Sequence, residues 1–148
     1  MKEEYIIDEN VIYNAWHGRK SDNTPALAEK KFLYDIFYGK QHIYISEKIR
    51  KKIIRMRKAI PKDPIDLDSF ALNMFLKLIF NSERTTILTG IKTDFQGIKK
   101  CDNEFVGVAL QSNGILVTAD AKLKKAIEAD PKVAKCNCIT ADEVVEKN

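Results

Sequence analysis

The sequence lacks any hydrophobic run long enough to cross a membrane. No window of the 148 residues approaches the roughly 18 consecutive apolar residues of a spanning helix. The opening residues, 1–8, also lack the apolar stretch of a secretion signal, so we expect a cytoplasmic protein with no membrane partner. With 45% apolar and 31% charged residues, the chain has the composition of a folded protein and the length of one domain, residues 1–148.

Cysteine is scarce, and its odd number excludes a complete disulfide framework. Cys136 and Cys138 lie two positions apart, which is closer than the spacing in a zinc knuckle, and no second pair accompanies them. We therefore expect Cys101, Cys136 and Cys138 to be small packing residues rather than metal ligands.

Several catalytic signatures are missing as well. The chain has no Ser/His/Asp set, no phosphate-cradling glycine loop and no dinucleotide fingerprint. His17 and His42 lack a partner at metal-ligand spacing, and we expect both on the surface or in a strand. Trp16 is expected in the core rather than as a base-stacking platform. No internal repeat or low-complexity segment divides the chain.

Apolar runs alternate with helical patterns along the chain, which predicts an α/β fold with parallel strands, since a parallel connection needs a crossover of about a dozen residues or more. We expect three layers, α/β/α, around a mainly parallel sheet of about five strands. The predicted strands span 5–7, 41–45, 85–88, 115–118 and 133–139. The predicted helices span 10–16, 25–39, 46–60, 68–80, 102–112 and 121–129, with a last helix after a capping box at 140–143.

Three aspartates stand beside these apolar runs. Asp8 follows the first strand, Asp120 follows the strand 115–118, and Asp102 opens the helix before it. In an open α/β sheet these positions share the edge where ligands bind. Carboxylates that converge there repel one another unless a cation such as Mg²⁺ or Mn²⁺ neutralises them, which predicts a metal-dependent hydrolase. The alternative is that all three are helix caps and turn residues.

Positive charge is concentrated in one helix. The segment from Lys48 to Lys62 has no acid and carries what we call the basic stripe: Lys48, Arg50, Lys51, Lys52, Arg55, Arg57, Lys58 and Lys62. Apolar residues recur at helical spacing between them, which predicts that the basic side chains face outward. The stripe indicates a polyanionic partner, and a solvated helix face is the alternative.

These motifs, in this order, resemble the PIN-domain family of metal-dependent nucleases. Residues 5–12 resemble the family's opening strand, which ends in Asp-x-Asn. Residues 102–110 resemble its third acidic motif, with the Asp-x-Glu-Phe of the toxin-like subgroup, and residues 115–120 resemble its Thr-x-Asp strand end. The resemblance extends from about Tyr5 to Val145 and implies the same α/β/α fold.

The resemblance implies an endoribonuclease that hydrolyses RNA phosphodiester bonds with Mg²⁺ or Mn²⁺. It makes Asp8, Asp102 and Asp120, here called the acidic triad, both metal ligands and catalytic residues. Supporting roles fall to Asn10, Thr118 and Glu104, which would orient carboxylates or water. RNA would lie on the basic stripe, with Lys48, Arg50, Lys51, Lys52, Arg55 and Lys58 as contacts. The toxin-like subgroup further implies an antitoxin partner and a homodimer, for which the apolar segment 70–80 is the candidate interface.

The chain departs from the family at one position. PIN domains normally carry a second acid about six residues after the serine that ends strand two, and here the count from Ser46 reaches Lys52, with Lys51 beside it. Two alternatives follow: a catalytically weakened PIN domain that binds RNA or a protein, and a phosphatase-like hydrolase with the same carboxylate chemistry. The basic stripe favours a polymeric substrate over a small one.

Overall fold

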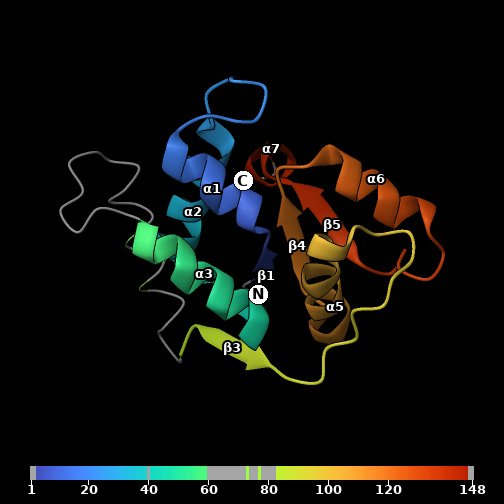
Figure 1. Cartoon of the computed structure of the whole chain (residues 1–148). Helices are drawn as coiled ribbons and strands as arrows, with labels where there is room; N and C mark the ends of the chain where they lie inside the picture. The colour runs from blue at the N-terminus through green and yellow to red at the C-terminus, as the bar shows by residue number, and fades with distance from the viewer. Residues whose placement is uncertain (1–2, 40, 60–72, 74–76, 78–82, 147–148) are drawn as a thin grey trace.

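A single parallel sheet forms the centre of the molecule (Figure 1). The computed structural model describes residues 3–39, 41–59, 73, 77 and 83–146. All strand pairs in the sheet are parallel, and the strands lie in the order β3-β2-β1-β4-β5. Their bounds are β1 Glu4–Ile7, β2 His42–Ser46, β3 Thr85–Leu88, β4 Ile115–Thr118 and β5 Asn137–Thr140.

Helices cover both faces of this sheet, which confirms the predicted three-layer α/β/α fold. One layer contains α1 (Glu9–His17), α2 (Leu27–Gly39) and α7 (Ala141–Glu146), which pack against one another and against β4 and β5. The other contains α3 (Glu47–Ala59), α5 (Asn103–Ser112) and α6 (Ala121–Ala129). Burial on both faces of a parallel sheet explains why the central strands β1 and β4 are nearly continuous apolar runs.

The register of the central strands sets the positions of the polar residues that follow them. Ile7 of β1 is the partner of Val117 of β4, and the Asp8 amide donates to the Val117 carbonyl oxygen at 2.9 Å. Asp8 and Thr118, which are 110 residues apart, therefore leave the sheet side by side. The carboxyl edge between β1 and β4 is thus a meeting point for distant parts of the chain.

The core holds the strands and helices in this arrangement. Ile6 and Leu116 are fully buried in the central strands, and Phe105 of α5 is buried against the sheet. Burying each such side chain stabilises the fold by roughly 1.5–3 kcal/mol. Because α5 is anchored through Phe105, its first residue, directly after Asp102, is held at the carboxyl edge.

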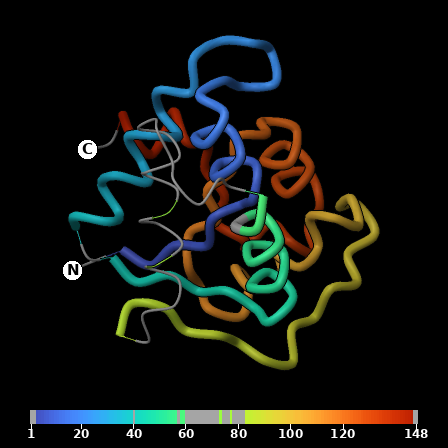
Figure 2. The backbone as a smooth tube through the Cα atoms, turned by 60° about the vertical axis from the view of Figure 1, so that its left-hand side comes forward, coloured from blue at the N-terminus to red at the C-terminus, as the bar shows by residue number. Residues whose placement is uncertain are grey.

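A long connection brings the chain from β3 to α5. Figure 2 shows residues 89–99 passing along the outside of the molecule before the chain returns to the start of α5. This connection lies so close to α5 that a Cβ added at Gly107 would be 2.2 Å from the carbonyl oxygen of Lys92. Glycine at position 107 therefore allows the connection to approach, and a short 3-10 helix, Lys100–Asp102, completes it.

Side-chain caps confirm two of the predicted helix starts. The Ile49 amide donates to Ser46 Oγ at 3.2 Å at the beginning of α3. In α7, the Glu143 amide donates to Thr140 Oγ1 and the Thr140 amide donates to Glu143 Oε1, which is the predicted capping box. These caps satisfy amides that have no partner within the helix.

The predicted strand 133–139 was wrong at its start. β5 begins only at Asn137, because the chain forms successive turns before it: the Val133 amide donates to Asp130 O, and the Cys136 amide to Val133 O. Cys136 lies in these turns and is nevertheless buried, as is Cys138 within the strand. Cys101 is exposed, so the packing role predicted for it was wrong as well.

Part of the prediction lies outside the described residues. Apart from Asn73 and Lys77, the predicted helix 68–80, including the candidate interface 70–80, falls in that region, as do Ile60 and Lys62. Among the helices that the structure describes, none combines the length and the apolar character needed to cross a membrane.

Candidate active site

Asp8 is the most deeply buried member of the acidic triad. It directly follows β1, is 2% exposed, and accepts a hydrogen bond from Thr118 Oγ1 at 2.8 Å on its Oδ2. Burial raises its pKa to about 7, and the charges of Asp102 and Glu9 act in the same direction, while the Thr118 hydrogen bond opposes them. Near neutral pH this carboxyl group therefore exchanges a proton readily.

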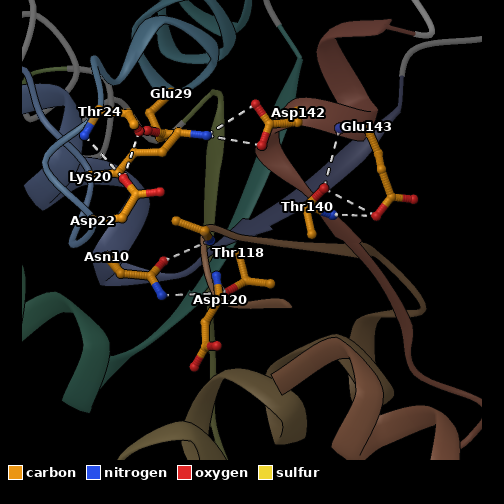
Figure 3. Close-up of polar contacts among 11 residues, drawn as sticks. Asn10, Lys20, Asp22, Thr24, Glu29, Thr118, Asp120, Thr140, Asp142 and Glu143 are labelled. Carbon is orange, nitrogen blue, oxygen red and sulfur yellow. Dashed lines mark hydrogen bonds and ion pairs between the residues drawn. The ribbon is translucent and has the colours of Figure 1, made fainter. Parts of the chain in front are cut away.

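Thr118 organises the polar groups around Asp8. Its hydroxyl donates to Asp8 and accepts from the Asp120 amide at 3.0 Å. It also accepts from Asn10 Nδ2 at 3.3 Å (Figure 3). Asn10 Oδ1 in turn accepts the Ala119 amide at 3.0 Å. One donor and two acceptor positions are all that a hydroxyl offers, so Thr118 is saturated. Asn10 and Thr118 thus fix the turn after β4 against the start of α1.

Asp102 and Asp120 lie at the starts of two different helices. Burial raises the pKa of Asp102, and the charge of Asp120 raises it further, while Lys99 opposes the shift. Asp120 Oδ1 accepts the Lys122 amide at 2.9 Å and so caps α6. A capping role therefore holds for Asp120, whereas neither Asp8 nor Asp102 makes a side-chain cap hydrogen bond to the helix it precedes.

A small cavity opens between these two aspartates. Its volume is about 140 Å³, and its lining residues are Gly97, Lys99, Asp102, Asp120, Lys122, Leu123 and Ala126. At about 30 Å³ per water molecule it has room for a few waters, and a phosphate group has comparable dimensions. Two carboxylates and two lysines on its walls suit a bound cation together with an anionic oxygen.

The acidic triad suits a divalent cation because its members are negatively charged and provide oxygen ligands. Each member is a carboxylate, and the charges of Asp102 on Asp8 and of Asp120 on Asp102 raise the pKa values of these groups. Such repulsion is what a hard cation relieves. Among the residues that the structure describes, however, no three His, Cys, Asp or Glu side chains are gathered as a ligand cluster.

Lys52 occupies the position at which the family resemblance expects an acid. Its Nζ lies 3.6 Å from Glu9 Oε1 and 5.4 Å from the centre of the Phe105 ring, and its side chain is 17% exposed. The contact with Glu9 joins α3 to the start of α1. Lys52 therefore supplies a fixed positive charge next to the acidic triad, whereas its neighbour Lys51 is exposed on α3.

Four members of the basic stripe are exposed on α3, as predicted: Lys48, Lys51, Arg55 and Lys58. Ile49 and Ile53 are buried beneath them. Arg50 Nη1 forms an ion pair with Glu47 at 2.9 Å. The Lys52 side chain is only 17% exposed, so the outward orientation predicted for it was wrong. Exposed lysine and arginine side chains on one helix can contact successive phosphates of a nucleic acid.

Glu104 is not tied to the acidic triad by its contacts. It lies in the first turn of α5 and is half-buried. Within the described part of the chain, no hydrogen bond or ion pair links Glu104 to Asp8, Asp102 or Asp120. Its predicted role in orienting water or the metal remains a prediction.

Two lysines at this edge are absent from the predicted site. Lys99 and Lys122 line the cavity, and Lys99 also lowers the pKa of Asp102. Each lies within three positions of a triad aspartate, and that proximity is the only signal in the sequence that could have identified them.

Comparisons with known proteins add no assignment. No protein-family model matches the chain, and no curated protein matches it. The functional proposal therefore depends on the geometry of the carboxyl edge and on the motifs in the sequence.

Proposed function

We propose that the protein is a divalent-metal-dependent endoribonuclease of the PIN type that hydrolyses RNA phosphodiester bonds. The observation that carries this proposal is the electrostatic coupling of Asp8, Asp102 and Asp120 at the carboxyl edge of the sheet. Burial and neighbouring negative charge raise the pKa values of Asp8 and Asp102, which is costly for the fold, and binding of a cation would relieve that cost. The exposed basic stripe supports a polymeric anion as the substrate.

Each residue of the edge has a part in this proposal. Asp8, Asp102 and Asp120 would hold Mg²⁺ or Mn²⁺. When bound, such an ion acts as a Lewis acid and lowers the pKa of water. Thr118 and Asn10 keep the Asp8 carboxylate and the β4–α6 turn in one orientation. The ammonium groups of Lys99 and Lys122 attract phosphate oxygens into the cavity.

An RNA cleavage assay tests the proposal. Structured RNA should be cut by the wild-type protein with Mn²⁺ and left intact with EDTA, and Asp8→Asn should lower the rate by at least about a hundredfold because a ligand charge is lost. Asp35→Asn, at a surface ion pair with Lys31, is the matched control and should cut normally. Cleavage that survives chelation or Asp8→Asn would remove the acidic triad as the catalyst.

A second candidate function is favoured by Lys52, since a fixed cation beside the triad competes with a metal ion. In that case the protein is a non-catalytic PIN domain that binds RNA or a partner protein. Lys52→Glu discriminates between the two. A gain of Mn²⁺-dependent cleavage would identify the natural chain as catalytically weakened, whereas loss of existing activity would identify Lys52 as a substrate contact. Lys125→Glu makes the same charge change at an exposed lysine of α6, outside the basic stripe, and serves as the control.

The toxin-like character, with an antitoxin partner and a homodimer, remains part of the proposal. The segment that suggests an interface, residues 70–80, lies outside the described residues. A phosphatase-like activity is less favoured, because a small phosphomonoester would leave the basic stripe without a role.

A further inference from the structure

Helix α1 carries a group of aromatic side chains that the active-site description does not use. The rings of Tyr13 and His17 are 4.2 Å apart between centroids, those of Trp16 and His17 are 4.6 Å apart, and those of Tyr13 and Trp16 are 6.2 Å apart. Tyr13 is 52% exposed, and His17 is also exposed. Trp16 is partly buried and packs against the core. We call these three residues the aromatic face of α1.

The aromatic face lies on the side of α1 that begins with Glu9 at the candidate active site. Glu9, Tyr13 and His17 follow one another at intervals of four residues, so they lie on one side of the helix, and the opposite side, with Val11 and Ile12, is buried. Eight residues of helix span about 12 Å. This side of α1 therefore extends about 12 Å from Glu9, next to Asp8, to His17, and the aromatic face occupies its second half.

The side of α1 that carries Glu9 contacts the positively charged helix α3. Glu9 is the residue that contacts Lys52 of α3, and the exposed members of the basic stripe lie on that helix. Exposed aromatic rings on a helix whose first turn contacts a positively charged helix suit a single-stranded nucleic acid, which combines bases that stack with a charged backbone.

We propose that the aromatic face of α1 is a stacking platform for the bases of single-stranded RNA, whose phosphates lie towards Lys52 and the exposed part of the basic stripe. This inference rests on the proposed nuclease function and specifies its substrate as an unpaired strand or loop. Double-stranded RNA does not fit, since its bases are already stacked within the helix and cannot lie on Tyr13 and His17.

The chain contains a single tryptophan, and it lies in the aromatic face. Trp16 fluorescence therefore reports directly on anything that stacks there. Oligouridylate, added in EDTA so that no cleavage occurs, should quench this fluorescence in parallel with binding measured by anisotropy. Duplex RNA should bind through the basic stripe with little quenching. Binding of oligouridylate without quenching, equal quenching by the duplex, or no binding at all would overturn the platform.

Substitution of Tyr13 gives an independent test. Tyr13→Ala should weaken oligouridylate binding at least about fivefold, the lower end of the effect of one base–aromatic stack, whereas Tyr13→Phe should keep the wild-type affinity. The matched control is Tyr34→Ala, which removes a tyrosine of similar exposure from a ring pair on α2 and should have no effect. Equal losses in Tyr13→Ala and Tyr34→Ala would contradict the proposal.

These outcomes separate the platform from the catalytic proposal. Quenching in EDTA by a protein that never cleaves RNA with Mn²⁺ would contradict the nuclease and support the platform. Metal-dependent cleavage by a protein whose Trp16 fluorescence does not respond to oligouridylate would support the nuclease and contradict the platform.

Discussion

Asp8 combines burial with neighbouring negative charge, and each of these disfavours its carboxylate form. Its carboxylate is buried, and it lies near the charges of Asp102 and Glu9. One hydroxyl hydrogen bond, from Thr118, offsets only part of this cost, so the pKa remains raised. A residue in this position weakens the fold at neutral pH and becomes favourable when a cation neutralises it.

The pKa of Asp8 leads to a prediction about stability. The pKa rises from 3.8 to about 7 on folding, so between these values the folded protein holds more of the proton than the unfolded chain. Asp8 therefore lowers the free energy of unfolding as the pH rises from about 4 to 7, and the full penalty persists above 7. In EDTA, the free energy of unfolding of Asp8→Asn, relative to that of wild type, should increase by roughly 2–4 kcal/mol when the pH is raised from about 4 to about 8. Urea denaturation at both pH values measures this gain.

The control for this experiment is Asp35→Asn, whose carboxylate lies at a surface ion pair with Lys31. It removes one carboxylate from the surface and should show no comparable gain. If the difference between Asp8→Asn and wild type were independent of pH, the carboxyl group of Asp8 would not titrate in this range, and its burial would have to be satisfied in another way.

At the scale of the element, one face of α3 packs against the core, and the other face is exposed to solvent. Ile49 and Ile53 anchor it against the sheet, and Ser46 caps its first turn. The side chains of Arg55 and Lys58 face water and take no part in this anchoring. Charges on the outer face can therefore be changed without loss of the helix.

This separation predicts the salt dependence of RNA binding. Each phosphate contact on a single strand contributes roughly 0.7 log units of affinity per log unit of salt, so replacing Arg55 and Lys58 together by glutamine should flatten the slope by about 1.4. The helix should remain intact, because glutamine has a helix propensity close to that of lysine and arginine. Anisotropy titrations with single-stranded RNA at several salt concentrations give both slopes.

A matched double variant, Lys125→Gln with Lys135→Gln, removes two exposed charges in and beyond α6. Its slope should equal that of wild type. If both double variants flattened the slope equally, RNA would respond to the net charge of the protein, and the basic stripe would be a solvated helix face.

Elements with strong periodicity could be predicted from sequence, and elements defined by local turns could not. The stretch 115–118 is a continuous apolar run that gave β4 with its observed bounds. The run 133–139 looks similar, yet Asp130 and Val133 accept backbone amides in turns, and only Asn137–Thr140 pairs with β4. Turn hydrogen bonds of this kind depend on the carbonyl direction of each residue, which hydrophobic pattern does not encode.

For the candidate site, the sequence predicted which residues lie at the carboxyl edge better than it predicted their side-chain contacts. Asn10 and Thr118 were expected to orient carboxylates or water at the site. Asn10 donates a hydrogen bond to Thr118, and Thr118 donates one to Asp8. The rotation of each side chain was beyond prediction, because it depends on competing local partners. Asp120 caps α6, and Lys52 turns towards Glu9, and neither contact follows from spacing alone.

At the scale of the whole molecule, the strand order creates the candidate site. β1 lies between β2 and β4, so the residues that follow β1 and β4 meet at one edge, and α5 delivers Asp102 to the same edge from the neighbouring layer. Thr118, which is 110 positions from Asp8 in the sequence, thus lowers the pKa of Asp8, and the charge of Asp102 raises it. We propose that this meeting point binds a divalent cation in the folded protein.

Calorimetric titration with Mn²⁺ near pH 7, repeated in buffers of different ionisation enthalpy, tests this claim most directly. Because the pKa of Asp8 is about 7 and that of Asp102 is raised, binding of the metal should displace protons, and the apparent enthalpy should change with the buffer. Wild-type protein should bind Mn²⁺ with proton release, and Asp8→Asn should bind at least about tenfold more weakly and release fewer protons. Absence of Mn²⁺ binding, or equal affinity and proton release in wild type and Asp8→Asn, would contradict the account.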